Sequence, residues 1–224
     1  HSPFVYGFYN EIIKGKSDTS QFIGIEKLRS EYLKDNQILS IQDLGAGSTI
    51  NTNTRRKIKS IAKKGITSVK DSLLFDRIIT YLSLKHVLEL VTSLGVNTLY
   101  LASNPLVQKV ISIEGCLETA NIAEQSFQGF FKDKISLIKG NIDNSFSEIA
   151  FQTTQLDFIF IDANHTYEAT KNYYKSCKRF IHEDTVMVLD DIYWSEDMLK
   201  AWDEIKNNVE VTLSIDLYDM GILF

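Results

Sequence analysis

The sequence is poor in cysteine and proline. Its 224 residues include only two of each, Cys116, Cys177, Pro3 and Pro105. The cysteines are far apart and show no CxxC spacing, which argues against a zinc site or a disulfide framework and makes a reducing cytoplasm the expected location. The scarcity of proline leaves no obvious flexible boundary between parts of the chain.

Long apolar runs and excess positive charge are also missing. No run approaches the roughly 20 apolar residues of a membrane-spanning helix, and the first residues lack the basic-then-apolar order of a signal peptide. The net charge of −5 does not favour binding to a nucleic acid. With 44% hydrophobic residues, the chain can form one large core, or a core with a small cap.

Short apolar runs alternate with amphipathic stretches in the second part of the chain. The apolar runs, rich in Val, Ile, Leu and Phe, span residues 86–90, 109–115, 134–141, 156–163 and 185–191. Such runs are typical of parallel strands buried on both faces, and the stretches between them have helical spacing. Residues 209–224 hold two strand-like runs without room for a helix, which predicts a hairpin with an antiparallel strand. We therefore expect an α/β, Rossmann-like sheet of seven strands with helices on both faces.

Residues 1–72 have a different pattern, with helical periodicity at 5–13 and 25–36 followed by polar and basic segments. We expect a mostly helical N-terminal cap or lid, a domain boundary near residue 72, and a helix over residues 72–82. A basic run lies in the cap and is either a solvated helix face or a lid that attracts an anionic substrate; it comprises Arg55, Arg56, Lys57, Lys59, Lys63 and Lys64.

Two loops compete as the site of a nucleotide-like cofactor. Such a loop should follow a strand, open a helix, and precede by about 20 to 25 residues a second strand that ends in an acid for the ribose hydroxyls. Residues 89–95 meet these requirements, with Glu89 ending one strand and Glu114 the next. The loop at 43–48 has more glycine, but a polar, basic stretch follows it. We interpret it as a turn in the cap, with a role in covering the bound cofactor or substrate as the alternative.

Three carboxylates end neighbouring strands. Asp162 ends one predicted strand, and Asp190 and Asp191 end the next, so their side chains should converge at the carboxyl edge of the sheet. Because like charges repel, a hard divalent cation such as Mg²⁺ is expected among them; the alternative is a pair of strand ends that only caps helices. His165 follows Asp162 closely, and is either a general base or substrate contact, or a residue that fixes a helix start.

The stretches ELVTSLGVNT, ISIEG, FIDANHTYE and VLDDIYW, in this order, resemble the class I S-adenosylmethionine-dependent O-methyltransferases. The chain is most similar to their metal-dependent small-molecule branch, which includes the catechol, caffeoyl-CoA and macrocin-type enzymes. The resemblance covers about residues 73–224. It implies the seven-stranded methyltransferase sheet, S-adenosyl-L-methionine (SAM) as cofactor, and methyl transfer to a hydroxyl of a small molecule, which could be anionic. A homodimer is the assembly we consider.

The same resemblance implies roles for individual residues. Glu114 would bind both ribose hydroxyls, the loop after Glu89 would lie beside the methionine part, and residues 140–142 would flank the adenine. The full cofactor set comprises Glu89, Val91, Ser93, Gly95, Asn97, Glu114, Gly115, Asn141, Ile142 and Asp162. The metal ligands would be Asp162, Asp190 and Asp191, and the catalytic residues His165 and Asp162. Asn164 stands where some relatives carry an acidic base, so the identity of the base is left open.

Val91 departs from this pattern, because a glycine usually stands there. The backbone passes close to the cofactor at that point, and a β-branched residue resists positive φ. Three interpretations follow: weakened cofactor binding, a rearranged loop, or an inactivating change. The alternative function is a catalytically silent binding or scaffold protein with the same fold. A nicotinamide enzyme is disfavoured, because GxGxxG is absent and the C-terminal hairpin disagrees.

Overall fold

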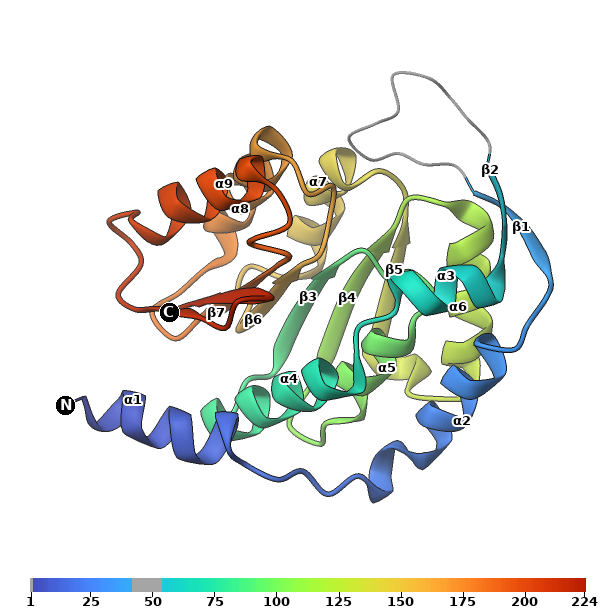
Figure 1. Ribbon diagram of the computed structural model, residues 1–224, viewed down its shortest axis with the longest axis horizontal. Coiled ribbons are helices and arrows are strands. Elements are labelled where there is room, and N and C mark those ends of the chain that lie inside the picture. The colour runs from blue at the N-terminus through green and yellow to red at the C-terminus, as the bar shows by residue number, and fades with distance from the viewer. Residues whose placement is uncertain (1, 42–53) are drawn as a thin grey trace.

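The computed structural model describes residues 2–41 and 54–224. Its centre is a seven-stranded sheet with the order β5-β4-β3-β6-β7-β9-β8 (Figure 1). The first five of these run parallel to one another, and β9 pairs antiparallel with both β7 and β8. Their bounds are β3 His86–Leu90, β4 Lys109–Glu114, β5 Ile135–Lys139, β6 Phe158–Ile161, β7 Val186–Asp190, β8 Ser214–Asp216 and β9 Met220–Leu223. The predicted fold class is confirmed, including the reversal at the C-terminal hairpin.

Helices cover both faces of the sheet, which explains the continuous apolar strands. Successive residues of β3 point to opposite faces: Leu88 belongs to one buried cluster and Val87 to the other. Phe146, Tyr173 and Trp202 cover the Leu88 face, from the helices α7 (Ile142–Gln152), α8 (Tyr167–Cys177) and α9 (Glu196–Lys206). The Val87 face is covered by α4 (Val69–Leu82), α5 (Val96–Ser103) and the N-terminal pair α1 (Pro3–Gly7) and η1 (Phe8–Ile13).

A third buried cluster joins the cap to the core. Here α6 (Leu117–Gln128) and α5 meet η2 (Ser20–Phe22) and α2 (Ile23–Tyr32) of the cap. The Phe22 and Tyr100 rings stack with their centroids 4.5 Å apart, and the Tyr100 hydroxyl donates to Glu26 over 2.7 Å. Two short 3₁₀ turns, η3 (Lys132–Lys134) and η4 (Lys178–Phe180), complete the connections. The described helices include none that is long and apolar enough to cross a membrane.

The cap contains strands that the sequence did not predict. β1 (Ile38–Ile41) and β2 (Thr54–Lys57) form an antiparallel pair, and α3 (Ile58–Gly65) follows. The expectation of a mostly helical cap was therefore incomplete, and the basic run is not one helix face, because Arg55, Arg56 and Lys57 lie in a strand. The strand depends on pairing with β1, a non-local contact that local periodicity does not reveal. The glycine loop at 43–48 lies outside the described residues.

The helix before the first strand of the large sheet begins earlier than predicted. Ser68 caps α4, because its hydroxyl accepts from the Asp71 backbone N–H over 3.1 Å. The helix therefore starts at Val69 rather than near residue 72, and the predicted domain boundary falls inside it. A serine followed three residues later by an acid was the cue that the sequence offered for this start.

Candidate cofactor and acceptor site

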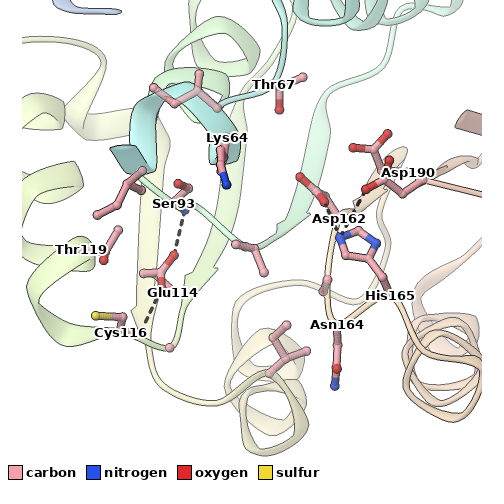
Figure 2. Close-up of a pocket in the computed structure, with 18 of the residues that line it drawn as sticks. Lys64, Thr67, Ser93, Glu114, Cys116, Thr119, Asp162, Asn164, His165 and Asp190 are labelled. Carbon is pink, nitrogen blue, oxygen red and sulfur yellow. Dashed lines mark hydrogen bonds and ion pairs between the residues drawn. The ribbon is translucent and has the colours of Figure 1, made fainter. Parts of the chain in front are cut away.

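A cavity of about 600 Å³ opens at the carboxyl ends of β3, β4, β6 and β7 (Figure 2). This is the edge at which open α/β sheets bind ligands. The core side includes most of the predicted site residues: Val91, Ser93, Glu114, Gly115, Asn141, Ile142, Asp162, His165, Asp190 and Asp191. The cap supplies the opposite side, with Ile41, Arg56, Ile61 and the segment 64–68.

The loop after β3 repeatedly enters the left-handed region of the backbone. Val91, Ser93 and Gly95 have φ values of 90°, 51° and 80°. Val91 therefore occupies a position that favours glycine, at a cost of about 1–3 kcal/mol for such a conformation. Backbone hydrogen bonds hold the loop in place, from Thr92 to the Ile113 carbonyl over 2.8 Å and from Gly95 to the Thr92 carbonyl over 2.9 Å. The turn therefore keeps the conformation that a glycine would favour, and Val91 adopts it with a strained backbone.

Glu114 lies beside this loop with its carboxylate held by backbone N–H groups. Ser93 donates to Oε2 over 2.8 Å and Cys116 donates to Oε1 over 2.9 Å. Each carboxylate oxygen has two lone pairs, so both oxygens retain capacity to accept a further hydrogen bond. The side chain is only 8% exposed, and this burial raises its pKa to about 6. Glu114 can therefore receive two hydroxyl donors from a ligand in the cavity.

The neighbouring strand end continues this part of the cavity. Asn141 caps α7, because its Oδ1 accepts from the Asp143 backbone N–H over 2.8 Å. Ile142 is partly buried and packs against the large core, and Thr119 of α6 contributes to the lining. Together with Glu114, these residues form a wall with one carboxylate and an apolar flank. Such a combination suits a nucleoside.

Glu89, Gly95 and Asn97 lie behind the cavity wall rather than on it. Glu89 is 1% exposed and accepts from Asn97 over 2.8 Å and from Ser112 over 2.6 Å. Its pKa is raised to about 7 by burial. A Cβ on Gly95 would lie 2.7 Å from the Phe127 ring, so this glycine permits close packing of the loop on α6. These three residues stabilise the loop. They do not line the cavity, so the contacts with the cofactor that the sequence predicted for them are not possible in this arrangement.

The other end of the cavity gathers the predicted aspartates around His165. The imidazole Nε2 lies 3.4 Å from Asp162 Oδ1 and 3.7 Å from Asp191 Oδ2. The hydrogen bond with Asp162 raises the His165 pKa above its ordinary value. Burial, together with the charges of Asp162 and Asp191, raises the pKa of Asp190 to about 8. The strand-end prediction of converging carboxylates is thus correct.

Strained backbone and unpaired polar atoms mark the same end. Asn164, His165 and Asp191 have φ values of 62°, 27° and 54°. His165 Nδ1 and Asn164 Oδ1 are buried and have no hydrogen-bond partner among the described residues. A buried polar atom without a partner typically costs about 1–3 kcal/mol. This end of the cavity therefore combines backbone strain with unsatisfied hydrogen-bonding capacity.

The aspartates have the right chemistry for a hard cation but not the arrangement. Among the residues that the structure describes, no group of three Asp, Glu, His or Cys side chains is placed to hold a metal ion. The imidazole of His165 lies between Asp162 and Asp191. The predicted metal site is therefore not formed by the side chains as they stand, because a ring occupies the space between two of its ligands.

Sequence reasoning identified the contribution of the cap only in part. The basic run indicated that cations lie in this region, but only Arg56 and Lys64 of that run line the cavity. Which members face inward depends on the strand-to-helix change at residue 58, which was not predicted. Tyr173 was also missed; its hydroxyl accepts a long hydrogen bond of 3.4 Å from Asn164. The signal for Tyr173 was only an apolar position on a helix, which does not distinguish core from cavity.

Comparisons with known proteins agree with this architecture. Residues 88–192 match a family described as a methyltransferase domain. None of the curated proteins shows significant similarity. An O-methyltransferase from Bacillus cereus in complex with SAH is 16% identical, with a TM-score of 0.63 over 98% of this chain and 96% of that one.

Two further solved structures are similar. The O-methyltransferase TomG from Streptomyces achromogenes, in complex with SAM, is 18% identical, with a TM-score of 0.61 over 70% of this chain and 80% of that one. The SAH-bound methyltransferase PaMTH1 from Podospora anserina is 14% identical, with a TM-score of 0.61 over 72% and 80%. At these identities the structures show a shared fold. Together with the domain match, they support the enzyme class that the sequence predicted, a methyltransferase.

Proposed function

We propose that this protein is a SAM-dependent O-methyltransferase that acts on a hydroxyl of a small molecule. One observation carries the proposal: a single cavity holds a carboxylate suited to a ribose diol at one end and an imidazole paired with aspartates at the other. The fold and the domain match support the same reaction. The SAM and SAH in the similar structures support the choice of cofactor.

The two ends of the cavity have different tasks in this reaction. Glu114 would accept hydrogen bonds from the ribose hydroxyls, and Ile142 would pack near the adenine. SAM supplies a methyl group made electrophilic by the sulfonium to which it is bound. His165 accepts the proton of the acceptor hydroxyl, while the oxygen forms its bond to the methyl carbon. The carbon–sulfur bond would break with its electron pair left on sulfur, and SAH would leave as the second product. Asp162 stabilises the imidazolium that forms.

The acceptor and the metal are finer parts of the proposal. Arg56 lines the nucleoside side of the cavity, and its charge would attract an acceptor that carries an anionic group toward the cavity without contacting it. A divalent cation remains a prediction, and its binding between Asp162 and Asp191 would require the His165 ring to move. Homodimer formation and a cytoplasmic location also remain predictions from the sequence.

A methyl-transfer screen tests the proposal. The protein is incubated with methyl-labelled SAM and a panel of catechols, sugars and other hydroxylated molecules, each with and without an anionic group, in Mg²⁺ and again in EDTA. We expect labelled product and an equal amount of SAH for at least one class. Binding of SAH without transfer to any acceptor would instead favour the silent scaffold alternative.

A further inference from the structure

Lys64 brings a positive charge from the cap into the cavity. It lies in the last turn of α3, and Figure 2 shows its side chain pointing into the cavity on the side of Ser93. The end of α3 is packed against the cofactor loop, since a Cβ on Gly65 would lie 3.4 Å from Ser93 Oγ. The position of Lys64 is thus tied to the loop that the sequence identified as the cofactor loop.

The chemistry of the cofactor determines which of its groups lies near Lys64. The sulfonium of SAM has three substituents: the ribose carbon, the transferred methyl, and the chain that ends in an α-amino acid. With the ribose held at Glu114, the methyl would face the acceptor beside His165. The third substituent therefore extends along the remaining wall, which is formed by the loop at Ser93 and by the segment 64–68.

The charges around this wall favour a cation beside the carboxylate of that chain. Glu114, Asp71 and Asp162 all line the cavity, and each would repel another carboxylate. Asn97 does not reach the cavity, because it donates to Glu89 and its Oδ1 accepts from the Ser72 hydroxyl over 3.1 Å. Lys64 is the cation that the structure places beside Ser93.

Arg56, the other member of the basic run on the cavity, belongs to a different part of the wall. It lies on β2, which pairs with β1. The Ser40 carbonyl of β1 lies 3.7 Å from the Cys116 Sγ, so this pair of strands is docked beside the loop that follows Glu114. Arg56 is accordingly on the nucleoside side, and Lys64 is on the amino-acid side.

We propose that Lys64 binds the α-carboxylate of the cofactor, and so makes the cap part of the cofactor site. This inference rests on the proposed function, because it assumes SAM in the cavity. It predicts that affinity for the amino-acid half of the cofactor depends on α3. Affinity for the nucleoside half depends on the sheet.

Two ligands separate these halves in a binding experiment. SAH carries the amino-acid chain, whereas 5′-methylthioadenosine has the same nucleoside and sulfur without a carboxylate. Lys64→Met should weaken SAH binding by about tenfold or more, the range of a lost charge-assisted hydrogen bond. The affinity of Lys64→Met for 5′-methylthioadenosine should stay within about twofold of the affinity that the unmodified protein has for this ligand. Lys64→Arg keeps the charge and should retain most of the SAH affinity.

Lys63→Met is the matched control, because Lys63 is exposed on the same turn and does not line the cavity. It should bind both ligands as the unmodified protein does. Equal SAH binding by Lys64→Met and the unmodified protein would overturn the inference, as would equal losses for the two ligands. If the unmodified protein binds neither ligand, the proposed function itself fails, which is a distinguishable result.

Discussion

The two ends of the cavity surround their carboxylates in different ways. Glu114 is held by backbone N–H groups of Ser93 and Cys116. Asp162 and Asp191 instead share the side chain of His165. Backbone dipoles are fixed and do not exchange protons, whereas an imidazole can rotate and can gain or lose a proton. The Glu114 end is therefore suited to binding and the His165 end to proton transfer. Both ends contain residues with left-handed backbone conformation.

We expect the largest effect from a substitution of His165, at the reactive end of the cavity. His165→Gln keeps a polar side chain but removes the proton acceptor. We expect kcat to fall by about 10²- to 10⁴-fold, the usual contribution of a general base. Affinity for SAH, measured by calorimetry, should change little, because the nucleoside end is intact. A variant with nearly full kcat would show that His165 only fixes the start of the following helix.

A change of pH should affect the binding end through Glu114. Burial raises its pKa from the ordinary 4.5 to about 6, so ionisation destabilises the ligand-free fold as pH rises through that window. The ribose hydroxyls need the ionised form. SAH affinity should therefore be about tenfold lower at pH 5 than at pH 8. In Glu114→Gln the affinity should be lower at pH 8, and this dependence should disappear. A profile that is the same in both proteins would assign the titration to another group.

Val91→Gly tests the strained loop at the binding end of the cavity. The substitution should relieve about 1–3 kcal/mol of backbone strain. Two effects oppose this gain in the free energy of unfolding: the partly buried valine side chain no longer packs, and glycine has more conformational freedom in the unfolded chain. We expect a thermal midpoint within a few degrees of the original. Affinity for SAH should increase roughly three- to tenfold, because the side chain leaves the cavity wall. Weaker SAH binding by Val91→Gly would mean that the valine packs on the ligand.

The smallest effect concerns the acceptor. Arg56 lines the cavity and the adjacent Arg55 does not, although both are exposed residues of β2. For an anionic acceptor, Arg56→Ala should raise KM by about two- to fivefold, because Arg56 attracts the acceptor into the cavity over a distance without forming an ion pair with it. Arg55→Ala should leave KM unchanged. Steady-state rates at low and high salt give the KM of each variant. Equal changes of KM in the two variants would show that Arg56 has no specific role.

The core and the main strand-end residues were predictable because their signals are local. Apolar runs located the five parallel strands, and the spacing from Glu89 to Glu114 identified the loop between the first two. Asp162 and Asp190 converge because parallel strands end at the same edge. Glu89 and Asn97 show the limit of this reasoning: spacing placed them on the correct loop, but not on the side facing the cavity.

The cap was harder to predict because its structure depends on distant partners. Arg55 and Arg56 are in a strand because β2 pairs with β1, and no periodicity within the basic run indicates that pairing. The same reasoning applies to the metal prediction. Three aspartates at one edge indicated a cation, and only the three-dimensional arrangement shows His165 between two of them.

Calorimetric titration of the unmodified protein with SAH at pH 8 is the decisive measurement for the cofactor site. We expect saturable binding of one SAH per chain, with weaker binding by Glu114→Gln and undiminished binding by His165→Gln. Absence of binding by both the unmodified protein and Val91→Gly would contradict this expectation, because neither the strained loop nor the carboxylate beside it would then serve a cofactor.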